Sequence, residues 1–186
     1  LALVTPGRFS VDTEKQGKAV GKAQPKGQYV YLIRQANRLI QCLRPELVLT
    51  VSGTDFTAAV QRMLEVASEH VTELDREQAL KDILEREQDF PTSLGNGIAA
   101  PHAYSKLLRR HVCIVAHAPD GIDMPAPDNV PVRFLFVVLS PTGDPQGHLM
   151  IMGQIAQLAI DGEMLETLAA AGTSTGRIEA IMARFQ

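Results

Sequence analysis

Short apolar runs alternate with stretches of helical spacing along most of the chain. Three runs rich in β-branched residues predict buried strands, and they lie at 46–51, 112–118 and 132–139. A fourth apolar run, at 98–101, is shorter. Apolar residues recur every three or four positions elsewhere and predict helices over 56–70, 75–87, 149–160, 163–171 and 174–184. This alternation predicts an α/β domain, a sheet with helices on both faces.

Residues that punctuate this pattern mark where the elements begin and end. Ser52 or Thr54 is expected to cap the first long helix and Asp75 the second, because short polar side chains accept hydrogen bonds from the first free amides. The last helix is expected to begin after Thr173 or Ser174. The stretch PTSLGNG at 91–97 has the composition of a loop.

The first 44 residues have a different character and predict an appendage to a domain over 45–186. Residues 5–28 are rich in Gly, Lys, Gln and Pro and are typical of a linker. A short amphipathic helix is expected over 28–43, ended by Pro45. That helix could dock on the domain, lead in from a preceding segment, or pair with a second copy in a homodimer.

The balance of basic and acidic residues also changes near residue 44. Residues 1–44 hold eight Lys and Arg but only Asp12 and Glu14, whereas the remainder holds ten basic and nineteen acidic residues. An acidic domain argues against binding to nucleic acid, where neutralising phosphates dominates affinity. The basic arm could face anionic lipid, face a partner, or remain solvated.

The remaining composition predicts a cytoplasmic protein. Apolar runs are shorter than the roughly 18 to 20 residues of a membrane-spanning helix. Cys42 and Cys113 form no CxxC pair, so two buried thiols are expected rather than a disulfide. His111 and His117 share one strand face, but no third ligand stands at a suitable spacing, so no metal is expected.

Candidate chemistry centres on three residues. His102 follows Pro101 at the end of the short apolar strand, after a loop containing Gly95 and Gly97, where α/β proteins usually place ligands. His148 opens a helix, near free amides and the positive end of the dipole. Arg86 ends the second helix; it could bind phosphate through its planar guanidinium, or pair with Asp82.

Four stretches together resemble one family. They are LRPELVLTVSGTDFTAAVQRMLE, EREQDFPTSLGNGIAAPHA, GIDMPAPDNVPVRFLFVVLSP and GHLMIMGQIAQLAIDGEML, which lie in this order between residues 43 and 165. They resemble the enzyme IIA domains of the mannitol/fructose class, including nitrogen-regulatory members, of the bacterial phosphoenolpyruvate-dependent sugar phosphotransferase system. The resemblance implies a three-layer sandwich with a central mixed sheet.

The resemblance also implies a phosphohistidine carrier without a cofactor. His102 would accept a phosphoryl group from a histidine phosphocarrier protein, and His148 and Arg86 would position it and neutralise its charge. The loop residues Thr92, Ser93, Gly95, Asn96 and Gly97 would support the phosphoryl oxygens through hydroxyls and backbone amides. The next partner would be a sugar-permease domain. Met124, Leu149 and Met150 are candidates for an apolar rim around the site, or could belong to the core.

Two other functions fit parts of the sequence. An enzyme IIA-like regulatory domain of a membrane transporter or antiporter, placed at the cytoplasmic face of the membrane, would explain the appended residues 1–44. It would act by binding rather than by phosphoryl relay. A hydrolase using Ser93 or Ser105 is disfavoured, because the chain lacks a Gly-x-Ser-x-Gly elbow.

Overall fold

One mixed sheet organises the computed structural model, which describes residues 37–185. Its strands are β1 (Val48–Thr50), β2 (Ser93–Gly95), β3 (Ile98–Ala99), β4 (His102–Ser105), β5 (Val112–Ile122) and β6 (Val132–Pro141). The order across the sheet is β1-β5-β6-β3-β2, and β4 pairs with β6 as well. The β5–β6 and β2–β3 pairs are antiparallel, whereas β1 pairs parallel with β5, and β3 and β4 pair parallel with β6.

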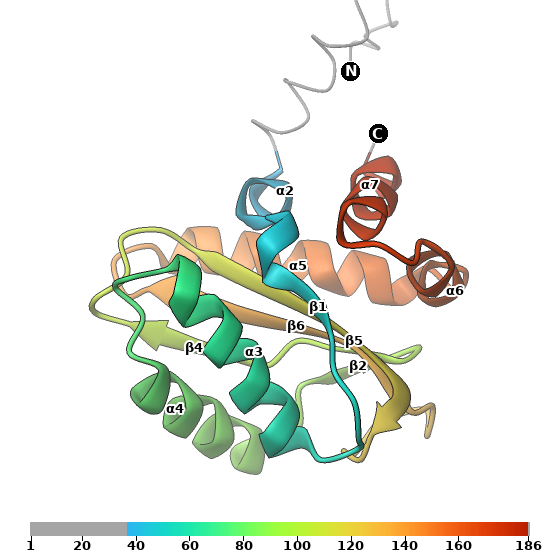
Figure 1. Ribbon diagram of the computed structural model, residues 1–186, viewed down its shortest axis with the longest axis horizontal. Coiled ribbons are helices and arrows are strands. Elements are labelled where there is room, and N and C mark those ends of the chain that lie inside the picture. The colour runs from blue at the N-terminus through green and yellow to red at the C-terminus, as the bar shows by residue number, and fades with distance from the viewer. Residues whose placement is uncertain (1–36, 186) are drawn as a thin grey trace, which may run out of the picture.

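Helices cover both faces of the sheet and complete three layers (Figure 1). Helices α3 (Phe56–His70) and α4 (Arg76–Asp89) pack on one face. The other face carries α2 (Arg38–Cys42), α5 (Pro145–Ile160), α6 (Met164–Ala170) and α7 (Ser174–Arg184), and a 3-10 turn, η1 (Pro45–Leu47), leads into β1. The predicted three-layer α/β fold is therefore confirmed.

Strand β6 shows why its sequence is apolar without alternation. Leu135 and Val137 pack under α3 and α4, whereas Phe134 and Phe136 pack under α5 and α7. All four side chains are fully buried. A strand covered on both faces has no solvent side to reserve for polar residues.

The edge beside β6 differs from the sequence expectation. Ser93–Gly95 is a strand rather than part of a loop, and His102 begins β4 instead of ending the short strand before it. Ile98 and Ala99 pair with the first half of β6 and His102–Ser105 with its second half. Pro101 lies at the break, because proline lacks the N–H that a continuous ladder would use.

Helix caps follow the predictions in two of three cases. Asp75 accepts from Gln78 N and Thr173 from Gly176 N, as expected. The cap of α3 is Asp55, whose carboxylate lies 2.6 Å from Ala58 N. Ser52 and Thr54 were the wrong choices, because the helix begins at Phe56 and Asp55 is the residue directly before it.

The predicted appendage falls mostly outside the described residues. Its last turn is α2, where Leu39 and Ile40 are buried against the α5 face. The amide of Leu39 donates to Gln154 Oε1 at 2.8 Å, which ties α2 to α5. Cys42 and Cys113 are buried free thiols, as expected. Within the described residues, no helix is long and apolar enough to span a membrane.

Candidate functional site

His102 presents one ring nitrogen to the site and turns the other toward the backbone. Its Nδ1 lies 3.0 Å from the carbonyl oxygen of Ala100, two residues before it. Because a carbonyl only accepts, Nδ1 carries the hydrogen and Nε2 keeps a free lone pair. Burial, aided by the positive charge of Arg86, lowers the pKa of His102. The ring is therefore a neutral nucleophile near neutral pH.

His148 lies against His102, as expected, although the two residues are 46 positions apart. The ring centroids are 5.1 Å apart and the ring planes tilt by 53°. Only 4% of His148 is exposed, in the first turns of α5. Burial, followed by the nearby His102 and His111 rings, lowers the pKa of His148 to about 4. His148 therefore remains uncharged at neutral pH.

The lowered pKa of His148 predicts that the domain loses stability in mild acid. In the unfolded chain His148 binds a proton below its ordinary pKa of about 6.5, whereas in the folded domain it binds one only near pH 4. The free energy of unfolding should therefore fall as the pH drops through this window, by on the order of 3 kcal/mol. Urea titrations at successive pH values measure this loss. The loss should shrink in His148→Gln, whereas exposed His70→Gln should match wild type; equal losses in all three chains would contradict the expectation.

Within residues 37–185, Arg86 forms no ion pair with a carboxylate, and its charge acts on His102. Its Nη1 donates to the Phe90 carbonyl oxygen at 2.7 Å, and the guanidinium lies 5.5 Å from the centre of the Phe90 ring. Asp82, the alternative partner, accepts from Gln78 instead. This arrangement fixes the arm of Arg86 and leaves other N–H groups for an anion.

Glu87 organises the segment that leads into the site, a role the sequence analysis missed. Its carboxylate accepts from the backbone N–H of Thr92 at 3.0 Å and also from the Thr92 hydroxyl. The Thr92 carbonyl in turn accepts from Ala100 N at 3.0 Å, next to His102. Ser93 Oγ is buried without a hydrogen-bond partner among the described residues. Thr92 and Ser93 are therefore the loop residues closest along the ladder to His102.

The glycine turn lies elsewhere, contrary to the sequence expectation. Ser93 pairs with Ala99 and Gly95 with Ile98, so Gly95, Asn96 and Gly97 turn the hairpin at the end away from His102. The amide of Asn96 donates to the Asp128 carboxylate at 2.6 Å, and its side chain donates to the Ala159 carbonyl. Their positive φ angles of 48° to 86° thus form a tight turn.

Four further residues lie near the two histidines; the sequence analysis considered His111 only as a metal ligand and did not single out the other three. The Tyr104 ring lies 4.7 Å from the His148 ring. Ser140 Oγ lies 2.9 Å from His148 Nδ1 and 3.0 Å from His111 Nδ1, and His111 Nε2 lies 3.0 Å from Asp144 Oδ2. The sequence offered no signal for this cluster, because Ser140 is 29 positions from His111 and only strand pairing brings them together.

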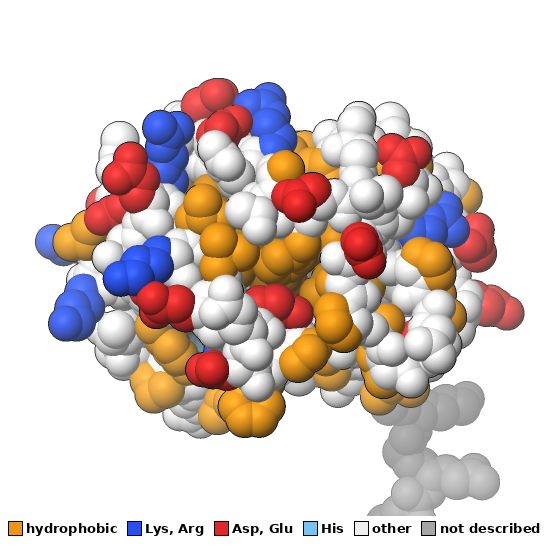
Figure 2. Space-filling model, turned by 90° about the horizontal axis from the view of Figure 1, so that it is seen from below, with side chains coloured by type: hydrophobic (Ala, Val, Ile, Leu, Met, Phe, Trp, Pro, Cys, Tyr) orange, Lys and Arg blue, Asp and Glu red, His pale blue; other side chains and the backbone are white. Residues whose placement is uncertain are grey.

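Exposed apolar side chains flank the site. Leu149 and Met150 follow His148 on α5 and are 69% and 43% exposed. Tyr104 and Phe90 are exposed on the neighbouring elements. Met124 takes the other expected position: it is half-buried against the core on the α3 and α4 face and lines a cavity with Asp120 and Asp123. Figure 2 views the molecule from below relative to Figure 1. On that face, apolar side chains gather at the centre, with acidic and basic groups around them.

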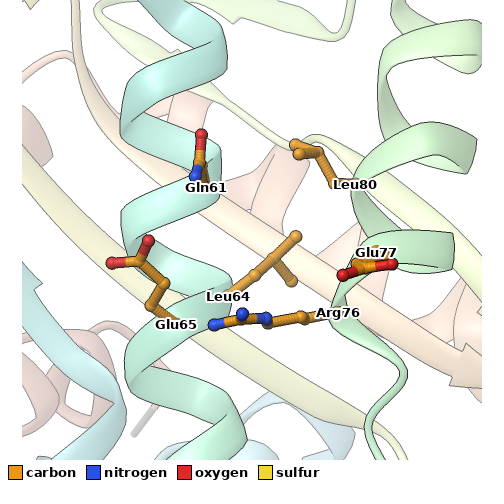
Figure 3. A pocket seen from close by; sticks show the side chains of 6 residues that line it. All are labelled: Gln61, Leu64, Glu65, Arg76, Glu77 and Leu80. Atoms are coloured by element: carbon orange, nitrogen blue, oxygen red, sulfur yellow. The ribbon is translucent and has the colours of Figure 1, made fainter.

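A second hollow, between α3 and α4, contains none of the candidate residues. Its volume is about 120 Å³, and Leu64 lies at its centre with Arg76 and Glu65 beside it (Figure 3). Among residues 37–185 no three His, Cys, Asp or Glu side chains gather as metal ligands would. The histidine pair therefore remains the site with the most distinctive chemistry in the described part of the chain.

Comparison with known families identifies a match over most of the domain. Residues 42–183 match the family model described as phosphoenolpyruvate-dependent sugar phosphotransferase system, EIIA 2. The chain is 31% identical to the PTS system fructose-specific EIIA component of Haloferax volcanii over 110 residues, which are 59% of this chain and 71% of that protein.

Two further proteins match a larger share of this chain, one in sequence and one in fold. The nitrogen regulatory protein of Pseudomonas aeruginosa is 28% identical over 138 residues, 74% of this chain and 90% of that protein. The solved complex of enzyme IIAMTL with phosphorylated enzyme IIBMTL from Escherichia coli matches with a TM-score of 0.62 at 17% identity. That match covers 76% of this chain and 97% of the other, and confirms the expected mannitol-type fold.

Proposed function

The chain belongs to the EIIA 2 family of the phosphoenolpyruvate-dependent sugar phosphotransferase system, and we propose that it carries a phosphoryl group on His102. The observation that carries this proposal is the geometry of the His102 ring. Its Nδ1–H donates a hydrogen bond to the Ala100 carbonyl, so the lone pair of the neutral ring is on Nε2, which is the nucleophile. His148 lies beside that ring, and the fixed cation of Arg86 acts on it.

The transfer step follows from these groups. The Nε2 lone pair of His102 attacks the phosphorus of a phosphohistidine on a small carrier protein. The donor P–N bond breaks, and its electron pair returns to the donor imidazole. Nδ1 keeps its hydrogen and its bond to Ala100 throughout. Arg86 stabilises the charge on the transferring oxygens, since phosphoryl transfer depends chiefly on positioning and electrostatic stabilisation.

The partners proposed are a histidine phosphocarrier protein as donor and a IIB or permease component as acceptor. The Escherichia coli IIA relative was solved in complex with phosphorylated IIB. Exposed Leu149, Met150 and Tyr104 beside the histidines provide an apolar surface that such a partner could cover. The proposal places residues 45–186 in the cytoplasm as the carrier domain, with residues 1–44 as a basic linker and short helix.

Phosphorylation of the purified chain tests this function. The chain is incubated with phosphoenolpyruvate, enzyme I and the histidine carrier protein, and its intact mass is measured at alkaline pH, where phosphohistidine survives. One added phosphoryl group is expected, and it should pass to a IIB protein when one is supplied. Absence of the added mass in a mixture that labels a known fructose EIIA would overturn the proposal.

Arg86→Gln should slow the transfer while leaving the domain folded. Removing a fixed charge that stabilises the transferring oxygens costs on the order of 100-fold in rate. Arg86→Lys should recover only part of this loss, because an ammonium lacks the planar pair of N–H donors. Rapid mixing with an alkaline quench measures the rate. Arg62→Gln on α3 is the matched control, and a rate for Arg86→Gln equal to that control would remove Arg86 from the mechanism.

A regulatory domain is the second candidate, favoured by the 28% identity to a nitrogen regulatory protein. Such a domain, attached to or associated with a membrane transporter, would bind its target in a phosphorylation-dependent way. The same experiment separates the two: a chain that accepts one phosphoryl group but passes none to IIB proteins fits the regulatory function.

A further inference from the structure

A continuous chain of hydrogen bonds ends on the buried histidine of the site. Asp144 Oδ2 lies 3.0 Å from His111 Nε2, and His111 Nδ1 lies 3.0 Å from Ser140 Oγ. Ser140 Oγ then lies 2.9 Å from His148 Nδ1. The chain runs from the residue that caps α5, across β5 and β6, to the ring that faces His102.

The surroundings of this chain restrict each group to the partners named. Ser140 is fully buried, and 4% of His148 and 6% of the His111 side chain are exposed. Gly147 lets the Asp144–His111 pair form, because a Cβ at this position would lie 2.5 Å from His111 Nε2 and from Asp144 Oδ2. Water therefore has little room between His111, Ser140 and His148, whereas the Asp144 side chain is 40% exposed and ends the hydrogen-bond chain at the surface.

The direction of the hydrogens follows from Asp144. The Gly147 N–H, and then His111, lower the pKa of Asp144, so it is ionised and can only accept. His111 Nε2 therefore carries a hydrogen. When His111 is neutral, its Nδ1 accepts from the Ser140 hydroxyl, and Ser140 Oγ accepts from His148 Nδ1–H. His148 Nε2 is then a bare lone pair, which repels phosphoryl oxygens.

A proton on His111 reverses the direction in which these hydrogen bonds are donated. Both nitrogens of the imidazolium donate, so the Ser140 hydroxyl accepts from His111 Nδ1 and turns its own hydrogen toward His148 Nδ1. The neutral His148 ring then carries its hydrogen on Nε2. In this form His148 is a donor, which is the polarity that an anionic phosphoryl group requires.

We propose that Asp144, His111 and Ser140 are positioning residues that set the tautomer of His148, and that His111 takes up one proton from solvent when His102 becomes phosphorylated. The inference rests on the proposed function of His102. His111 and Asp144 line a cavity of about 260 Å³ together with four arginines: Arg38, Arg44, Arg109 and Arg110. A negative phosphoryl group on His102 would add attraction for a proton on His111.

Nitrogen-15 NMR of the histidine side chains tests the tautomer directly in the full chain. In unphosphorylated protein at pH 8, His148 should carry its hydrogen on Nδ1. It should move to Nε2 as the solution is acidified enough to charge His111, and also after phosphorylation at pH 8. An unchanged His148 tautomer in both experiments would overturn the proposal. The acid titration needs no phosphoryl transfer, so it can succeed or fail independently of the proposed function.

Two variants connect the tautomer to the rate. Ser140→Ala should lower the transfer rate roughly 10- to 100-fold at neutral pH, because His148 loses the group that directs its hydrogen. The wild-type rate should fall as pH rises and His111 loses its proton, and Ser140→Ala should lack this dependence. Gly147→Ala should have the same effect by separating His111 from Asp144. Ser140→Ala with the wild-type pH profile, in a protein of normal thermal stability, would restrict Ser140 to a structural role.

Discussion

Replacing His102 with Gln is expected to abolish phosphoryl labelling of the chain. The glutamine side chain is uncharged and close to histidine in size, and the β4–β6 pairing is made by the backbone, so β4 should keep its pairing with β6. An amide nitrogen has no available lone pair, however, and cannot form the P–N bond. Intact-mass analysis after incubation with phosphoenolpyruvate, enzyme I and the carrier protein should show only unmodified chain.

A matched control exists within the same chain. His70 ends α3 and is exposed, and His70→Gln should be labelled like wild type. His148→Gln should be labelled slowly but to completion, because it removes a neighbour of the nucleophile and not the nucleophile itself. Labelling of His102→Gln at the wild-type level would require another acceptor and would refute the assignment of His102.

Phe136→Ala should have the largest effect on stability. Phe136 is fully buried near the middle of β6, where it packs with residues of α2, α5 and α7. Truncating such a side chain removes its burial and leaves a cavity that the strands cannot close, which costs about 3–5 kcal/mol. Because domains of this size have a total stability of roughly 5–15 kcal/mol, the variant should be close to unfolding at physiological temperature.

Urea unfolding followed by circular dichroism measures this loss. Ile160→Ala is the matched control, since Ile160 is 78% exposed at the end of α5 and its truncation should change the unfolding free energy by less than about 0.5 kcal/mol. Equal unfolding midpoints for the two variants would mean that the core beneath α5 relaxes around the missing ring.

The amino-acid sequence determined the elements that are buried on both faces and the identity of the two facing histidines. The runs at 112–118 and 132–139 are rich in β-branched residues and apolar at nearly every position, which is typical of strands buried on both faces, and they lie in β5 and β6. His102 and His148 were candidates because of what adjoins them, a proline after a short apolar strand in one case and the start of a helix in the other, and the family resemblance implied that they face each other. Such local signals survive because backbone preference and burial act within a few residues.

Tertiary structure alone decided which polar groups meet. The antiparallel pairing of Val112 with Leu139 places His111 beside Ser140, and the cap of α5 then brings Asp144 to the same point. Likewise, the pairing of Ser93 with Ala99 carries the glycine turn away from His102, although it is close in sequence. A hydrogen bond depends on position to within a few tenths of an ångström. That precision comes from the register of packed strands and helices, which no spacing along the chain encodes.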